Sequence, residues 1–138
     1  MMRSKKPILL VEDDEVDVLT VRRALRDLEV ENDLVVAGNG EEALDILGDP
    51  EHVQPCIILL DLNMPRMNGL EFLRHVREDN CARGVPIVVL TTSRQDRDIV
   101  DGFDLNVAGY MVKPVDYRKF VEVIHAIDLY WTLSELPS

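Results

Sequence analysis

Five side chains that could do chemistry together stand directly after short apolar runs of the sequence. Glu12 and Asp13 follow the first run and Asp61 follows the third, while Thr91 and Lys113 follow two later ones. Neighbouring carboxylates repel one another, and burial raises that cost, so the usual partner of such a cluster is a hard divalent cation. Mg²⁺ takes one or two protein carboxylates and keeps several waters, which suits one acid of the first pair, Asp61 and a backbone carbonyl just beyond it.

A carboxylate beside Mg²⁺, with an amine and a hydroxyl opposite, is equipped for phosphoryl transfer. Asp61 would attack phosphorus in line, while the metal and Lys113 neutralise the equatorial oxygens. The Thr91 hydroxyl could donate a hydrogen bond to one of those oxygens. The segment 62–69 after Asp61 is a loop by its Pro, Asn and Gly content, and we expect Gly69 to let the chain turn tightly into the next helix.

These side chains can meet only if the apolar runs are strands of one sheet. The runs at 8–11, 56–60 and 87–90 are continuously apolar, as is typical of strands covered on both faces, and two more stand at 34–37 and 107–112. Helical spacing predicts helices over 15–29, 40–48, 68–79, 95–104 and 116–134. The alternation predicts an α/β fold with a parallel sheet, helices on both faces and a functional crevice at the carboxyl ends of the strands.

Length and charge narrow the class of protein. The 138 residues suit one domain, and 46% hydrophobic with 30% charged residues is a globular composition. The 26 acidic against 15 basic residues disfavour nucleic acid and anionic membranes as partners. Without a signal-like start or a membrane-length apolar stretch, we expect a cytoplasmic protein. Asp14, Glu15 and Asp17 are expected to be only the acidic first turn of a helix.

Four segments together resemble the receiver domain of two-component response regulators, in that family's order and spacing: 8–14, 60–69, 88–93 and 109–114. The resemblance implies a flavodoxin-like (βα)₅ fold with strand order 2-1-3-4-5. It implies one receiver domain over 1–138, with an extended last helix and short tail at about 116–138. It also implies a switch protein rather than an enzyme, one that takes a phosphoryl group from a sensor histidine kinase and catalyses only its own phosphotransfer and slow autodephosphorylation.

The resemblance also implies roles for individual residues near the phosphoryl group. Asp61 would be the phosphoacceptor, and Glu12 and Asp13 would form the acidic Mg²⁺ pocket, with Asp13 the more direct ligand. Asn63 would supply its backbone carbonyl to the metal. Thr91 and Lys113 would contact the phosphoryl group.

The same resemblance implies a switch that reaches the surface. Tyr110 would pack inward when Thr91 moves toward the phosphoryl group, changing the face built from the fourth and fifth helices and the fifth strand. The Lys113–Pro114 peptide would be cis, which is a minority state even before proline.

Two residues beside the expected phosphoryl site are unusual. The family most often has a small residue after the switch threonine, where Thr92 stands here, and a longer acid or amide at the next position could place the attacking water, where Ser93 stands. Thr92 adds a methyl and a hydroxyl next to the acyl phosphate, and Ser93, which with Asn63 flanks the line of water attack, is short and uncharged. We therefore predict slow self-hydrolysis of phospho-Asp61, lasting minutes or longer. The decay after acetyl phosphate loading measures it, and a lifetime of seconds would contradict the prediction.

The carboxyl-terminal segment 127–138 and the approach Leu105 to Val107 are similar to stand-alone regulators that partner phytochrome-type histidine kinases. That resemblance implies a homodimer. Spare apolar surface on the last helix favours the same conclusion, and the expected dimer or partner face includes Tyr110, Phe120, Tyr130 and Trp131. Alternatively, Tyr130 and Trp131 only cap the core of a monomer.

Other functions remain to be weighed. A haloacid-dehalogenase-type phosphatase would need an Asp where Asn63 stands, and a flavodoxin would not place acids at 12–15, where a flavin phosphate would bind. Two alternatives stay open: a phosphorelay intermediate that passes its phosphoryl group onward, and a protein-binding receiver used without phosphorylation.

Overall fold

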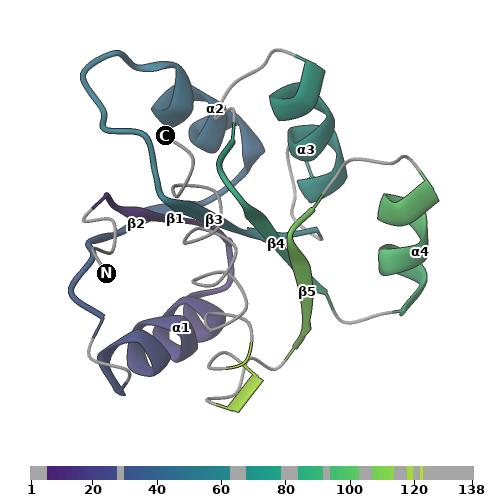
Figure 1. Cartoon of the computed structure of the whole chain (residues 1–138), viewed down its shortest axis with the longest axis horizontal. Coiled ribbons are helices and arrows are strands. Elements are labelled where there is room, and N and C mark those ends of the chain that lie inside the picture. The colour runs from purple at the N-terminus through teal and green to yellow at the C-terminus, as the bar shows by residue number, and fades with distance from the viewer. Residues whose placement is uncertain are drawn as a thin grey trace, which may run out of the picture.

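A computed structural model of the chain describes residues 6–27, 30–62, 68–78, 84–91, 94–102, 107–113, 118–119 and 122. Its centre is a five-stranded parallel sheet of order β2-β1-β3-β4-β5 (Figure 1), which confirms the expected fold class and strand order. The strands are β1 (Ile8–Val11), β2 (Leu34–Ala37), β3 (Ile57–Asp61), β4 (Ile87–Thr91) and β5 (Gly109–Val112). Asp61 and Thr91 are therefore the last residues of their strands.

The helices of the described ranges alternate with these strands, as the spacing predicts: α1 (Glu15–Asp27), α2 (Gly40–Gly48), α3 (Gly69–Glu78) and α4 (Arg94–Gly102). Of the expected last helix over 116–134, only residues 118, 119 and 122 are described, and all three are helical. Within the described residues, no helix combines the length and apolar character that crossing a bilayer requires.

Two apolar cores, one on each face of the sheet, explain why the central strands show no alternation. On one face α1 packs Val21, Ala24 and Leu25 against β-strand side chains. On the other face the core includes Phe72, Leu73 and Val76 of α3, Ala43 and Leu47 of α2, and Val100 of α4. Figure 1 shows α1 on the side of the sheet opposite α2 and α3. Every residue of β1, β3 and β4 is buried, as in parallel sheets covered on both faces.

The register of the sheet brings the strand ends level with one another. Val11 pairs with Leu60, so Glu12, the next residue, stands beside the end of β3 at Asp61. Thr91 pairs with Val112, which places Lys113 one residue beyond the end of β4. Side chains that lie far apart in the sequence thus meet at the carboxyl edge of the sheet, where open α/β sheets hold their functional sites.

Candidate functional site

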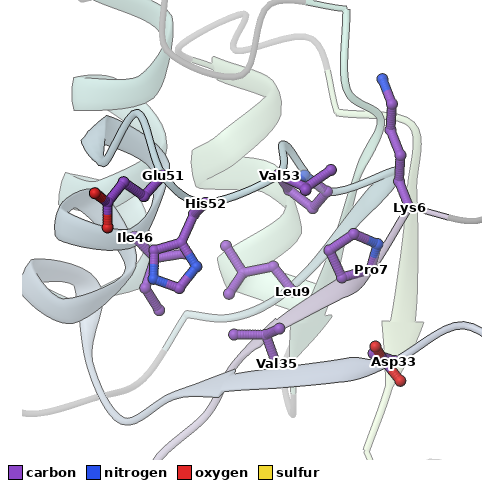
Figure 2. Close-up of a pocket in the computed structure, with 10 residues that line it drawn as sticks. Lys6, Pro7, Leu9, Asp33, Val35, Ile46, Glu51, His52 and Val53 are labelled. Carbon is purple, nitrogen blue, oxygen red and sulfur yellow. The ribbon is translucent and has the colours of Figure 1, made fainter.

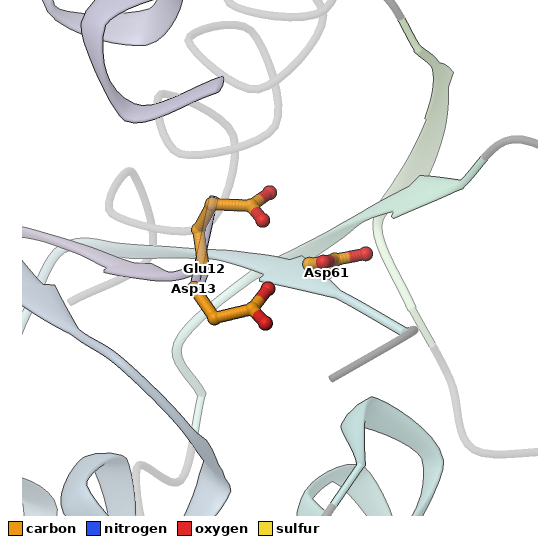
Figure 3. Close-up of side chains that lie close together, drawn as sticks. All are labelled: Glu12, Asp13 and Asp61. Carbon is orange, nitrogen blue, oxygen red and sulfur yellow. The ribbon is translucent and has the colours of Figure 1, made fainter. Parts of the chain in front are cut away.

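Three carboxylates converge at the carboxyl edge of the sheet. The ligand oxygens of Glu12, Asp13 and Asp61 lie within 4.8 Å of one another. Figure 3 shows Glu12 and Asp13 at the end of β1, with their carboxylates directed toward the side where Asp61 lies on β3. Glu12 and Asp61 are 1% and 3% exposed, whereas Asp13 is exposed to solvent. The cluster therefore has two buried members and one open to solvent.

Lys113 supplies the positive charge of this cluster. Its Nζ lies 2.8 Å from Glu12 Oε2 and 3.2 Å from Asp61 Oδ2. A third carboxylate also reaches it, because Asp17 Oδ2 lies 2.9 Å from the same nitrogen and accepts a hydrogen bond from it. The Lys113 backbone N–H donates to the Thr91 carbonyl at 2.8 Å, which fixes the start of this side chain against the end of β4.

The pKa values of Glu12 and Lys113 are both raised, but for different reasons. Burial raises the pKa of Glu12 to about 7, and the neighbouring Asp61 adds to the rise although Lys113 opposes it. Burial alone would lower the pKa of Lys113, but its contacts with Glu12 and Asp17 outweigh that effect and raise the pKa. Lys113 is therefore charged throughout the physiological range, and one ammonium does not fully compensate the buried acids.

The donor set fits a hard divalent cation. Glu12 Oε2 is buried and accepts no hydrogen bond of good geometry from the described residues, even though the Lys113 ammonium lies close to it. A buried carboxylate oxygen in that condition is costly unless a further cationic partner satisfies it. Glu12, Asp13 and Asp61 would hold such an ion, and oxygen ligands of this kind are those that Mg²⁺ and related cations prefer.

Thr91 and Tyr110 lie on β4 and β5, beside the cluster, and Tyr110 also contacts α4. Thr91 is 2% exposed at the end of β4. Tyr110 is half-buried on β5 and packs against the core on the α2–α3 face. Its hydroxyl donates to Asp101 Oδ1 of α4 at 2.6 Å. Sequence reasoning singled out both Thr91 and Tyr110 but missed Asp101.

Removal of the Asp101 carboxylate tests this bond directly. We expect Asp101→Ala, which leaves the Tyr110 hydroxyl without this acceptor, to lower the free energy of unfolding by about 1 kcal/mol more than a control, the usual net contribution of such a hydrogen bond. Urea denaturation measures it, with Asp98→Ala, exposed on the same helix, as the matched control. In a Tyr110→Phe background the substitution should cost no more than the control, and an undiminished cost there would contradict the bond.

The structure places some expected site residues and leaves others outside the described ranges. It brings together Glu12, Asp13, Asp61, Thr91 and Lys113 at one edge and places Tyr110 on the neighbouring strand. The remaining expected residues lie outside the described ranges: Asn63, Thr92, Ser93, Pro114, Phe120, Tyr130 and Trp131. Asp17 was expected to be only an acidic first-turn residue of a helix. Its contact with Lys113 shows that this interpretation was incomplete.

A separate hollow lies at the opposite, amino-terminal edge of the sheet (Figure 2). It has a volume of about 670 Å³ and is lined by residues before and within the first two strands and after α2, among them Pro7, Leu9, Val35 and His52. In Figure 2 the Lys6 ammonium and the Asp33 carboxylate lie on different sides of Pro7. Among the described residues, the candidate group of metal ligands is the one at the carboxyl edge and includes no residue of this hollow.

Comparisons with known proteins find relatives that match most of the length of the chain. The response regulator receiver domain family matches residues 8–125. The response regulator Rcp1 of Synechocystis is 32% identical over 130 residues, which cover 91% of this chain and 88% of that protein. The solved bacteriophytochrome response regulator RtBRR is 42% identical with a TM-score of 0.81, over 88% of this chain and 76% of that one. A Mn²⁺-bound form of Rcp1 is 30% identical with a TM-score of 0.74, over 91% and 94%.

Proposed function

Because this chain belongs to the response regulator receiver domain family, we propose that it is a switch that accepts a phosphoryl group on Asp61. One observation carries the proposal: Asp61 ends β3 beside Lys113 and within the acidic cluster of Glu12 and Asp13. The arrangement combines a nucleophilic carboxylate, a fixed ammonium and a set of metal ligands at one point. Such a combination suits phosphoryl transfer, where catalysis is mostly positioning and charge neutralisation.

The transfer needs no other nucleophile from the chain. A carboxylate oxygen of Asp61 attacks the phosphorus of a phosphohistidine, the P–N bond breaks, and the imidazole nitrogen leaves with the electron pair. Lys113 neutralises the charge of the phosphoryl oxygens, and the Thr91 hydroxyl donates a hydrogen bond to one of them. Glu12, Asp13 and Asp61 would hold a Mg²⁺ ion, which when bound would further neutralise those oxygens. The family resemblance implies that Asn63 would add its backbone carbonyl to the ligands of that ion.

The consequence of phosphorylation is proposed to reach the surface through Tyr110. Inward movement of Tyr110 would break its bond to Asp101, which joins β5 to α4 in the present structure. The bond thus favours one of two pre-existing states, and phosphorylation shifts the balance toward the other. The face around α4, β5 and the helix expected after them would then bind a partner or a second copy of the chain, and the family resemblance predicts Phe120, Tyr130 and Trp131 on that face.

We propose a phytochrome-type histidine kinase as the phosphoryl donor, in a cytoplasmic pathway without nucleic acid or membrane as a partner. The support is the similarity of this chain to the bacteriophytochrome response regulator RtBRR. Mg²⁺ is proposed as the metal on the acidic cluster, supported by the Mn²⁺-bound form of Rcp1. We also propose that residues 1–138 form a single receiver domain, whose only further chemistry is slow autodephosphorylation.

Phosphotransfer profiling tests the donor and the metal together. The chain would be mixed with autophosphorylated phytochrome-type kinases and with unrelated histidine kinases, each with Mg²⁺ or with EDTA. We expect transfer within the first minutes from a phytochrome-type kinase only, and none with EDTA. Equal transfer from all kinases would contradict the pairing, and undiminished transfer in EDTA would contradict the metal.

A further inference from the structure

The first turn of α1 contributes a carboxylate that the proposed phosphoryl chemistry leaves without a role. We propose that Asp17 is a positioning residue for Lys113. It gives the ammonium a partner beside the metal position, so that a divalent cation can take Glu12 and Asp61 while Lys113 stays at the phosphoryl site. The inference rests on the proposed function and assigns that site a further residue.

Lys113 is shared among carboxylates from three elements. Its Nζ lies 2.9 Å from Asp17 on α1, 2.8 Å from Glu12 after β1, and 3.2 Å from Asp61 at the end of β3. The Lys113 ammonium donates a hydrogen bond to Asp17 Oδ2. Glu12 Oε2 lies as close but accepts no hydrogen bond of good geometry from the described residues, so Asp17 is a well-aligned acceptor for the ammonium.

Asp17 differs from the other two acids in what else it can bind. Among the described residues, the acids that share a possible metal position are Glu12, Asp13 and Asp61. The Asp17 side chain is also more open, with 22% exposed against 0% for Glu12 and 4% for Asp61. A cation entering the cluster would thus take two partners of Lys113 and leave the third.

The ammonium and a divalent cation compete for the same two buried carboxylates. Both are positive, so each is destabilised by the other at close range. Without Asp17, metal binding would leave Lys113 half-buried and short of an acceptor, which is costly. With Asp17, the ammonium keeps an ion pair and remains near Asp61, where the phosphoryl oxygens arrive.

The capping of α1 explains why Asp17 is available for this role. Asp14 Oδ1 accepts hydrogen bonds from the backbone N–H groups of Val16 at 2.8 Å and Asp17 at 3.2 Å. This cap stabilises the backbone of the first turn, which carries the Asp17 side chain that contacts Lys113. Glu15 lies in the same turn but is exposed, so it provides a matched control of equal charge.

Mg²⁺ binding and phosphoryl uptake test the role of Asp17 separately. Calorimetric titration with Mg²⁺ would be run without a phosphodonor, and uptake from acetyl phosphate at saturating Mg²⁺. We expect Asp17→Asn to weaken Mg²⁺ binding about fivefold and to slow uptake by a similar factor, as the loss of one partly exposed ion pair implies. Asp17→Glu should recover most of both values, and Glu15→Gln should change neither by more than about twofold.

A Lys113→Met background separates positioning from a general charge effect. There, Asp17→Asn should affect Mg²⁺ affinity no more than Glu15→Gln does, because the residue that Asp17 positions is gone. The proposal is overturned if Asp17→Asn matches Glu15→Gln in the wild-type background, or if its effect persists undiminished in Lys113→Met. A wild-type chain that takes up no phosphoryl group would instead overturn the proposed function. The Mg²⁺ affinities of the variants in the two backgrounds would still decide the role of Asp17.

Discussion

Asp61→Asn is expected to abolish phosphoryl uptake, with a loss of at least about a thousandfold in rate, because an amide is a far weaker nucleophile than a carboxylate. The substitution keeps the size of the side chain, so the end of β3 should remain in place. It also removes one charge from a cluster whose other buried acid, Glu12, already has a raised pKa. We therefore expect the metal-free variant to be at least as stable as the wild-type chain.

Phosphate-affinity gels after acetyl phosphate treatment would measure uptake, and urea denaturation would measure stability. Asp45→Asn, an exposed acid on α2, is the matched control and should behave as the wild-type chain in both experiments. If the Asp61→Asn variant accepted phosphate at the wild-type rate, the assignment of the phosphoacceptor would be wrong. A variant that is inactive because it is unfolded would be recognised by its denaturation curve.

Gly69→Ala is expected to lower the free energy of unfolding by about 2–4 kcal/mol, a cost typical of a severe overlap in a packed region. Gly69 begins α3, and its backbone N–H donates to the Leu62 carbonyl at 3.0 Å. A Cβ atom there would overlap the Asp61 carbonyl oxygen and the Leu62 Cα, which are backbone atoms and cannot rotate away. The backbone that carries the proposed phosphoacceptor would have to move.

Gly48→Ala is the matched control for that substitution. Gly48 ends α2, and a Cβ atom added there would meet nothing within 4 Å. We expect it to be neutral or stabilising by up to about 1 kcal/mol, because alanine loses less backbone entropy on folding. Thermal unfolding of both variants makes the comparison, and equal effects of the two substitutions would contradict the close approach at Gly69.

The role of Gly69 shows where sequence reasoning found the right residue for an incomplete reason. A glycine after a loop predicted a tight turn into the next helix, which would depend on its conformational freedom. Among the glycines that the structure describes, the one with a positive φ is Gly84, not Gly69. Gly69 is needed because α3 begins directly against the backbone at the end of β3. The local sequence pattern does not show how closely these two backbone segments approach.

Much of the fold followed from the sequence because its signals are local. Continuous apolar runs mark strands buried on both faces, and the helices between them have regular apolar spacing. The observed bounds of the described strands and helices coincide with the predicted ones at half of their ends and differ by one or two residues at the others, for example β3 at Ile57–Asp61 against 56–60. The expected last helix lies mostly outside the described residues, so most of it stays a prediction from the apolar spacing of the sequence.

The sequence by itself determined which acids, hydroxyl and amine stand at the carboxyl edge, since parallel strands bring their ends to one side of the sheet. It could not determine which acid of a charged helix turn meets Lys113. Glu15 and Asp17 have the same charge in the same turn, but each residue rotates the side-chain direction by about 100° around a helix of 3.6 residues per turn. The packing of α1 against the sheet directs Asp17 to Lys113 and leaves Glu15 in solvent. Only the tertiary structure decides such a contact, because it depends on how elements far apart in the chain are oriented toward each other.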